Sequence, residues 1–225
     1  MVIGAKMSYQ AKTVYKNEKV VKEYDQNRFF SVKGWLTDRL EKKLVYKAIK
    51  RANILPPSKL LDVPCGTGRL SLFLAKKGFY MTGVDISPAM ISQSKAKTQL
   101  IQIKTHTEFM AGDAESLPFS DSSFEAAISL RLFGHLPTEN RHNVLKELNR
   151  VSSSFVIVVY YHKNSLQTLR RKKMRARKGN FWNPVSLKQI DSELKAANLK
   201  CVAKFFLLPG ISETVIVLAK KAKDC

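Results

Sequence analysis

The sequence is poor in acidic residues, cysteine and long apolar runs. Its 225 residues contain 18 Asp and Glu against 39 Lys and Arg, with three cysteines and four histidines. Cys65, Cys201 and Cys225 do not have the spacing of a zinc site and do not make a disulfide scaffold. The longest apolar run, residues 155–161, is far shorter than the roughly 20 residues that cross a bilayer. These shortages argue against a metal centre, a disulfide-rich secreted domain and a membrane-spanning protein.

Targeting and repeat signals are also missing. The first ten residues, MVIGAKMSYQ, lack the basic start and apolar stretch of a signal peptide, and no internal repeat is visible. A hydrophobic content of 44% with 25% charged residues is typical of one folded domain with a full core. We therefore expect a soluble protein located in the cytoplasm, with peripheral membrane contact as a variant of that location.

Positive charge is concentrated outside the middle of the chain. The formal net charge is +21. Residues 1–53 hold 13 basic and 5 acidic residues, residues 54–161 hold 11 and 9, and residues 162–180 hold 8 and none. Such runs are often solvated helical faces, but they also attract anionic substrates, lipid surfaces or nucleic acid. The sequence alone leaves both readings open.

Apolar periodicity predicts a helical N-terminal segment. Helices are expected over residues 18–30 and 35–52, and the second has one apolar stripe formed by Leu36, Leu40, Leu44, Val45 and Ile49. These two helices would form a cap over residues 1–53, ahead of the Pro56-Pro57-Ser58 break.

Strands alternate with helices after this cap. Strands are expected over residues 59–63, 80–84, 107–110, 124–130 and 155–161, with helices over 69–77, 89–97 and 140–151. This alternation predicts a parallel sheet that is covered on both faces. A last helix over 184–197 and two β-runs over 201–207 and 213–219 would close the sheet edge as an antiparallel pair.

A glycine turn follows the first expected strand, in L-L-D-V-P-C-G-T-G-R-L at residues 60–70. Such a turn lets a ligand approach the backbone closely. Asp85, 19 positions after Gly66, can accept hydrogen bonds from both hydroxyls of a ribose. A pyrophosphate-binding turn needs a third glycine, but Ser71 stands there, and Asp62 would repel a phosphate. The pattern favours a nucleoside ligand that carries positive charge.

Three motifs together resemble a known family. D-V-P-C-G-T-G-R, G-V-D-I-S-P-A-M and A-G-D-A-E-S-L-P-F-S-D-S-S-F-E look like those of class I S-adenosylmethionine-dependent methyltransferases, in the ubiquinone/menaquinone-type, small-molecule branch. The resemblance covers residues 59–161, and Pro64 stands where many members have glycine. It implies a Rossmann-like, doubly wound α/β sheet of seven strands in the order 3-2-1-4-5-7-6 with strand 7 antiparallel. The methyltransferase domain would span residues 54–225, including a basic insertion at 162–180.

The resemblance also implies a binding site for S-adenosyl-L-methionine and no metal. Every matched position lies at the end of an expected strand or in the loop after it. The matched positions are Asp62, Cys65, Gly66 and Gly68 for the methionine part, Asp85 and Ile86 for the ribose and adenine, Asp113 and Ala114 for the adenine amino edge, and Leu130 and Arg131 beside the methyl donor.

Candidates for acid–base chemistry are fewer, because methyl transfer needs a general base only if the acceptor must lose a proton. His135, in R-L-F-G-H-L, lies where family members place substrate-side residues, and Tyr24 resembles a tyrosine of the family's capping helix. Each also has a plain structural reading, as a helix-start or core histidine and as a packing residue. Tyr160 and Tyr161 either line the pocket or are ordinary strand aromatics.

The acceptor is predicted mainly by elimination. Residues 130–133 read Leu-Arg-Leu-Phe, not the Asn/Asp-Pro-Pro-Tyr of base-amine methyltransferases, and Cys65 lies in the cofactor turn, where it cannot serve as a cytosine-attacking nucleophile. We expect a small-molecule or lipid-like acceptor, including an anionic one. The alternatives are an RNA-modifying enzyme whose basic rim binds phosphates and a cofactor-binding regulator without turnover. Residues 163–178 would contact an anionic membrane or RNA, and no stable protein partner is inferred.

Overall fold

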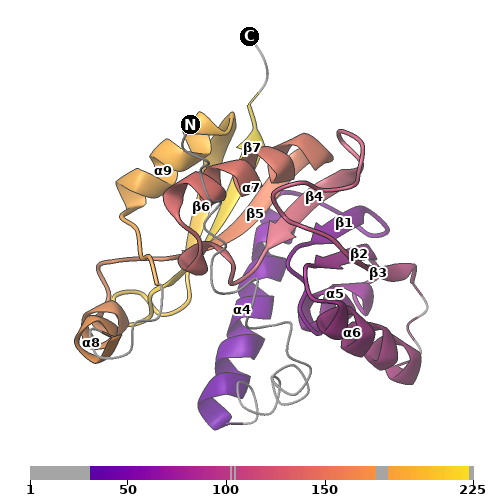
Figure 1. Ribbon diagram of the computed structural model, residues 1–225, viewed down its shortest axis with the longest axis horizontal. Helices are drawn as coiled ribbons and strands as arrows, with labels where there is room; N and C mark the ends of the chain where they lie inside the picture. The colour runs from indigo at the N-terminus through magenta and orange to yellow at the C-terminus, as the bar shows by residue number, and fades with distance from the viewer. Residues whose placement is uncertain (1–30, 102, 104, 176–181, 223–225) are drawn as a thin grey trace, which may run out of the picture.

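The computed structural model describes residues 31–101, 103, 105–175 and 182–222 as one α/β fold (Figure 1). Its sheet has seven strands in the order β3-β2-β1-β4-β5-β7-β6. The pairs among the first five strands are parallel, and β7 is antiparallel to both β5 and β6. The predicted doubly wound architecture, strand order and antiparallel strand are therefore confirmed.

The elements follow the expected alternation with small shifts at their ends. The strands are β1 (Lys59–Asp62), β2 (Tyr80–Asp85), β3 (Thr107–Ala111), β4 (Phe124–Ser129), β5 (Ser152–Tyr161), β6 (Leu199–Phe206) and β7 (Thr214–Lys221). The helices are α4 (Val32–Arg51), α5 (Arg69–Ala75), α6 (Pro88–Ile101), the short 3₁₀ helix η1 (Phe133–His135), α7 (Thr138–Val151), α8 (Leu166–Arg175) and α9 (Leu187–Ala196). The sequence predicts no separate element where α8 lies, and the helix expected over 18–30 falls outside the described residues.

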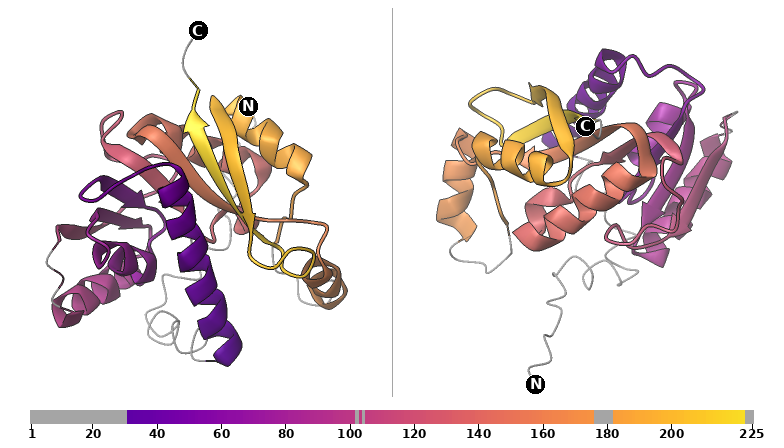
Figure 2. Two further views of the ribbon diagram at one scale, coloured as in Figure 1. Left: turned by 180° about the vertical axis from the view of Figure 1, so that it is seen from behind. Right: turned by 90° about the horizontal axis from the view of Figure 1, so that it is seen from above.

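The sheet is buried on both faces, as its continuous apolar strands predict. Successive strand residues point to opposite faces, so Leu60 packs with Val45 of α4 and Leu74 of α5, while Leu61 packs with Leu145 of α7. Figure 2, seen from above, shows α7 and α9 on one side of the sheet and α4 on the other.

Helix α4 crosses one face of the sheet and continues past its edge (Figure 1). Ser31 caps its start by accepting a hydrogen bond from the N–H of Gly34 at 3.1 Å. Val45 and Ile49 are buried as expected, but Leu36 is 48% exposed, so the predicted apolar stripe is wrong at that end. The physical reason is that the first turns of α4 lie beyond the sheet that would cover them.

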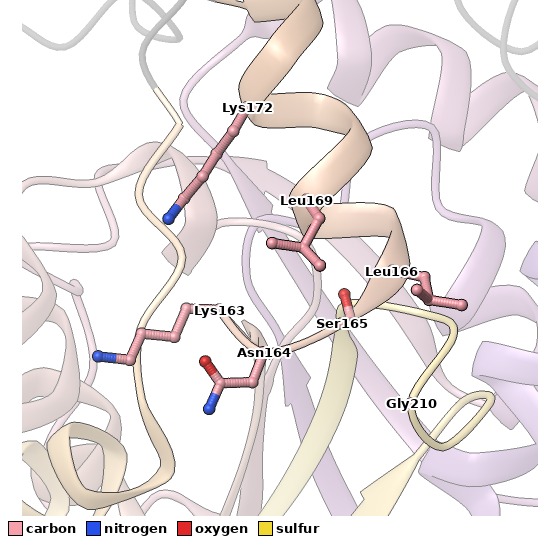
Figure 3. A pocket seen from close by; sticks show the side chains of 7 residues that line it. All are labelled: Lys163, Asn164, Ser165, Leu166, Leu169, Lys172 and Gly210. Carbon is pink, nitrogen blue, oxygen red and sulfur yellow. The ribbon is translucent and has the colours of Figure 1, made fainter.

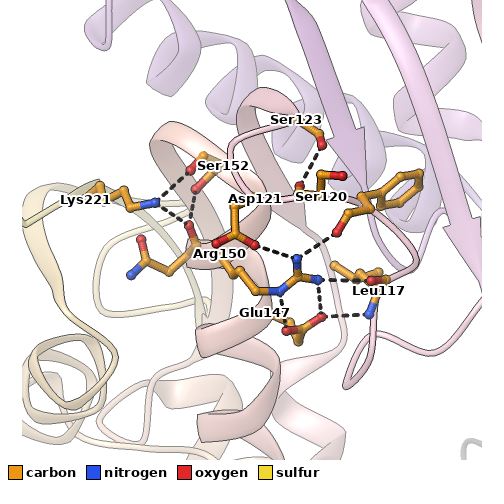
Figure 4. Close-up of polar contacts among 10 residues, drawn as sticks. Leu117, Ser120, Asp121, Ser123, Glu147, Arg150, Ser152 and Lys221 are labelled. Carbon is orange, nitrogen blue, oxygen red and sulfur yellow. Dashed lines mark hydrogen bonds and ion pairs between the residues drawn. The ribbon is translucent and has the colours of Figure 1, made fainter.

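Arg150, near the end of α7, fixes the loop between β3 and β4 (Figure 4). Its guanidinium donates to the carbonyl oxygens of Phe119 at 2.7 Å and Leu117 at 3.0 Å, and to Asp121 Oδ1 at 2.9 Å. Glu147 pairs with Arg150, which lowers the pKa of the Glu147 carboxyl, and accepts the N–H of Leu117 at 2.7 Å. The loop that carries the third sequence motif is thus held by side chains from a helix on the sheet face.

Candidate functional site

The glycine turn between β1 and α5 lies at the carboxyl edge of the parallel strands. Gly66 and Gly68 have φ angles of +53° and +76°, a region that favours glycine. A Cβ atom at Gly68 would lie 2.9 Å from the Cβ of Ser94, so close packing requires this glycine. A Cβ at Gly66 would meet nothing within 4 Å. The backbone at Gly66 therefore borders open space that a ligand can enter.

Asp85, the last residue of β2, ties this turn to the neighbouring strand. Its Oδ2 accepts the N–H of Gly66 and its Oδ1 accepts the N–H of Ser87, both at 2.9 Å. Burial raises the pKa of the Asp85 carboxyl in spite of these bonds. An ionised carboxylate has about four lone-pair sites, so each oxygen can still accept a second donor. The predicted contact with a ribose diol is compatible with this arrangement.

Asp62, the last residue of β1, is buried beneath the same turn. Its Oδ2 accepts the hydroxyl of Ser71 at 2.6 Å, but its Oδ1 is buried without a hydrogen-bond partner. Burial, with a smaller contribution from Asp85, raises the pKa of Asp62 to about 7. Two buried carboxyl groups therefore flank the glycine turn. Such a site favours a cation and opposes a phosphate, because burying an unpaired charge is costly.

Cys65 turns its side chain away from this open space. The thiol packs in a small cluster with Leu72, Ile91 and Phe109, and burial raises its pKa well above the ordinary value. The N–H of Cys65 donates to the carbonyl oxygen of Val84 at 2.8 Å. The side chain stabilises the turn by packing, and a thiol in this environment is a poor nucleophile.

The residues predicted to contact adenine lie at the ends of β2 and β3, two adjacent strands. Ile86 is half-buried directly after Asp85. Asp113 closes a tight turn, since its Oδ1 accepts the N–H of Glu115 at 3.1 Å. Ala114 is buried against the core. The topology therefore brings these positions to the same sheet edge as the glycine turn.

Leu130 and Arg131 follow β4, next to β1 in the sheet. Leu130 is buried in the core on the α4 side. Arg131 has a φ angle of +64°, and its guanidinium binds Glu41 of α4, with Nε donating to Oε2 at 2.7 Å. Burial raises the pKa of Glu41, and Arg131 opposes that rise. The Arg131 side chain is thus bound to α4, and the backbone of Arg131 is the part that lies at the sheet edge.

A second ion pair joins the same helix to the glycine turn. Arg69, the first residue of α5, pairs with Asp38 of α4. Asp38 and Glu41 are the only acidic residues of α4 and stand three positions apart, which places them on one face of the helix. Sequence reasoning missed both, although two acids at this spacing in an otherwise basic helix are a usable signal for buried partners.

His135 lies at the end of η1, on the β4–β5 side of the edge. Its ring meets the ring of Tyr161 edge-on, with centroids 6.1 Å apart. Gly134 packs against the same tyrosine, since a Cβ there would lie 2.0 Å from Tyr161 Cδ2. His135 is half-buried, so the structure brings it and Tyr161 together at the place predicted for the acceptor. Tyr24 lies outside the described residues.

Tyr160 belongs to the core and not to this edge. It is buried, its hydroxyl donates to Glu193 Oε2 at 3.1 Å, and its ring packs on Phe133. Arg141, fully buried, binds Glu193 Oε1 through Nη2 at 2.7 Å and donates from Nη1 to the carbonyl oxygen of Leu136 at 2.9 Å. This network holds the segment after η1 against α9. Within the described ranges, no group of three or more His, Cys, Asp and Glu side chains is placed to hold a metal.

Comparison with known proteins connects this site to methyl transfer. Residues 60–154 match a family described as methyltransferase domain. The chain is 29% identical over 133 residues to norajmaline N-methyltransferase of Rauvolfia serpentina, which is 54% of this chain and 44% of that protein. It is 33% identical over 91 residues to sterol 4-C-methyltransferase strm-1 of Caenorhabditis elegans, covering 40% of this chain and 27% of that protein. The chain spans less than half the length of these curated relatives.

Solved structures share the fold. Magnesium protoporphyrin IX methyltransferase from Synechocystis PCC 6803 with bound SAH superposes with a TM-score of 0.74 at 19% identity, covering 92% of this chain and all 100% of that one. A SAM-dependent methyltransferase from Methanosarcina mazei gives a TM-score of 0.64 at 23% identity, covering 78% of this chain and 98% of that one. At these identities the likeness concerns the arrangement of strands and helices.

Proposed function

The chain carries a class I S-adenosylmethionine-dependent methyltransferase domain, and from this premise we propose that it transfers a methyl group from S-adenosylmethionine to a small-molecule acceptor. The observation that carries the proposal is the pair of buried carboxyl groups, Asp62 and Asp85, beside the open backbone of Gly66. A ligand with an ammonium, a ribose and a sulfonium satisfies that site, whereas a dinucleotide does not.

The residues present fit the cofactor, which when bound supplies a methyl group on a positively charged sulfur. The orphaned Asp62 Oδ1 would accept from the ammonium, Asp85 from the ribose hydroxyls, and Ile86 would cover the adenine. Asp113 and Ala114 would border the adenine amino edge. The backbone of the glycine turn would make further contacts, since Gly66 leaves room for close approach.

The protein contributes to the reaction by aligning the methyl donor and the acceptor in a site that holds little water. The acceptor's lone pair forms the new bond to the methyl carbon while the carbon–sulfur bond breaks, with its electrons staying on sulfur. His135, half-buried beside Tyr161, stands on the acceptor side. It would take the proton that an O–H or N–H acceptor loses.

Relatives with this domain are named for different acceptors. Their names include norajmaline N-methyltransferase, a probable tocopherol O-methyltransferase of rice and sterol 4-C-methyltransferase. We propose a small, lipid-like acceptor for this chain as well. The ubiquinone/menaquinone-type branch stays a prediction from the sequence motifs.

Two glycines provide a matched test of the cofactor site. Gly66 and Gly210 both have positive φ and both leave open space where a Cβ would stand. Alanine at either position costs about 1 kcal/mol of stability. We expect only Gly66→Ala to lower the affinity for S-adenosylhomocysteine, by about tenfold or more, in titration calorimetry. Equal affinity in both variants, or NAD bound more tightly than S-adenosylhomocysteine, would contradict the proposed site.

The acceptor can be identified by transfer of labelled methyl groups into fractionated extracts. Label in the lipid or small-metabolite fraction supports the proposal. Label confined to RNA or protein overturns the acceptor class, and cofactor binding without transfer to any fraction supports the regulatory alternative.

The same assay with His135→Phe tests whether His135 is the general base. If it is, the substitution lowers turnover and flattens the pH profile of turnover without weakening cofactor binding.

A further inference from the structure

A mixed basic and apolar surface lies on α8 and the β6–β7 loop, away from the cofactor turn. We call it the α8 surface. Its apolar members are Leu166, Leu169, Leu208 and Ile211, which are 54%, 57%, 46% and 56% exposed. Its basic members Lys163, Arg170 and Lys172 are also exposed. Single exposed apolar side chains are common on protein surfaces, but four large ones close together indicate an interaction site.

Specific contacts hold this surface together. The N–H groups of Leu166 and Gln167 donate to the carbonyl oxygens of Gly210 and Ile211, each at 3.0 Å. The inner face of α8 is fixed by buried Thr168, whose hydroxyl donates to the carbonyl oxygen of His162 at 2.7 Å. Leu166, Leu169 and Arg170 stand three and four positions apart, so they share the opposite, outward face. The leucines are exposed because α8 is pinned in this orientation.

The surface has an excess of positive charge beside exposed apolar side chains. Residues 162–180 contain no acidic residue, and the nearby Glu213 is buried and paired with Arg171. A hollow of about 550 Å³ opens between α8 and the loop, bordered by Lys163, Leu169 and Lys172. Figure 3 shows the two ammonium groups pointing to the same side of α8, with Leu169 nearby. Such a hollow suits an anionic headgroup joined to an apolar chain.

We propose that the α8 surface docks this protein on an anionic lipid bilayer, without spanning it. An interfacial helix inserts leucines among the acyl chains while its lysines and arginines meet anionic headgroups. RNA would use the charges, but it would gain nothing from exposed leucines, since single strands stack on aromatic or Arg side chains. Among the helices the structure describes, none is long and apolar enough to cross the bilayer.

Docking would also orient the methyl-transfer site. Helix α8 follows the carboxyl end of β5, and Figure 1 shows α8 and the first turns of α4 at the same end of the molecule. The acceptor side would therefore face the lipid, where a lipid-like acceptor is dissolved. This last step rests on the proposed function, whereas the docking does not.

Vesicle flotation tests the docking with the full chain. Phosphatidylcholine vesicles should bind it weakly, and vesicles that also contain phosphatidylserine should bind it strongly. The double variant Leu166→Ser/Leu169→Ser should lower the vesicle partition coefficient about tenfold. Lys163→Gln/Lys172→Gln should lower it about fivefold for each charge removed. Exposed residues elsewhere serve as controls: Leu55→Ser and Lys195→Gln/Lys200→Gln should bind like the unmodified chain.

Three results would overturn the proposal. These are no preference for phosphatidylserine, equal loss in the control variants, or leucine variants that bind normally. Single-stranded RNA is added in a parallel titration, and tight RNA binding that only the lysine variants weaken would assign the surface to RNA instead. Calorimetric titration with S-adenosylhomocysteine accompanies each variant. A variant that loses vesicle binding but keeps its cofactor affinity has lost docking alone. The docking proposal and the proposed methyl transfer are therefore tested separately.

Discussion

The two halves of the carboxyl sheet edge are built on different principles. At β1 and β2, the site residues bind one another through the backbone of short loops, as Asp85 does with Gly66 and Ser87. At β4 and β5, side chains from distant elements meet, and Glu41 and Arg131 are 90 positions apart. The acids of the first half therefore belong to a local motif, although Arg69 beside the glycine turn also pairs with Asp38 of α4. The second half depends on contacts that only the completed fold creates.

The halves also differ in how buried charge is balanced. Glu41, and Glu193 in the core next to the β4–β5 half, each have an arginine partner, Arg131 and Arg141. Among the described residues, Asp62 has no arginine bound to it: Ser71 is its hydrogen-bond partner, and its Oδ1 has none. Removing one partner of a buried ion pair leaves a buried charge uncompensated and is strongly destabilising. A buried carboxylate without a positive partner costs stability until a ligand supplies the missing charge. The comparison predicts that acids of the two halves respond differently to mutation.

The largest effect is expected at Glu41. Glu41→Ala removes the buried carboxylate that pairs with the Arg131 guanidinium, which costs about 3–5 kcal/mol of unfolding free energy. Urea denaturation measures this loss. Asp191→Ala, which breaks a more exposed pair with Lys204, is the control and should cost about 1 kcal/mol or less. Equal losses of unfolding free energy in the two variants would show that the buried Glu41–Arg131 pair matters no more than a surface pair.

At Asp85 the expected loss is in ligand binding. Asp85→Ala removes the acceptor proposed for the ribose and should weaken S-adenosylhomocysteine binding by about 1–3 kcal/mol in calorimetry. Some stability is also lost, because the N–H groups of Gly66 and Ser87 lose their acceptor. Asp121→Ala, at an exposed acid, should bind normally. Unchanged affinity in the Asp85 variant would contradict the ribose assignment.

Local patterns predicted the alternation of strands and helices and the positions of the glycine turn, Asp62 and Asp85, because each depends on residues close in sequence. The strand order was implied by the resemblance to a known family and not by periodicity, and the fold confirms it. Asp85 ends β2 as expected, and the antiparallel β6–β7 pair closes the edge. The same reasoning predicts His135 as a residue of the acceptor side, and it did not foresee the ring contact with Tyr161.

Long-range features could not be predicted in the same way. The exposure of Leu36 depends on how far α4 extends past the sheet, which no helical period reveals. The link from Glu41 to Arg131 depends on tertiary packing. Helix α8 was not predicted because Arg and Lys make up half of its sequence and its apolar residues are few: Leu166, Leu169 and Met174. Its orientation is set by contacts with the β6–β7 loop.

A smaller effect should depend on pH through Asp62. Its pKa is about 7 in the folded protein and about 3.9 in an unfolded chain, so its contribution to stability is present below about pH 4 and is lost as the pH rises through about 7. Binding the cofactor's ammonium requires the ionised form. Affinity should therefore rise about tenfold between about pH 6 and about pH 8, with proton release in calorimetry. Asp62→Asn should abolish this dependence, and a flat profile in the unmodified protein would contradict it.

Ser71 offers the finest test of the same half of the site. Its hydroxyl donates to Asp62 Oδ2 at 2.6 Å and thereby favours the ionised carboxylate. Ser71→Ala removes a bond worth about 0.5–1.5 kcal/mol, so the pKa of Asp62 should rise further, by about one unit or less. The increase in cofactor affinity should then occur at higher pH, while affinity well above both pKa values stays nearly unchanged. Thr98→Ala is a suitable control, because that hydroxyl also bonds inside the fold but contacts neither acid. A profile that shifts to lower pH in Ser71→Ala would mean that the hydroxyl accepts a hydrogen bond from protonated Asp62.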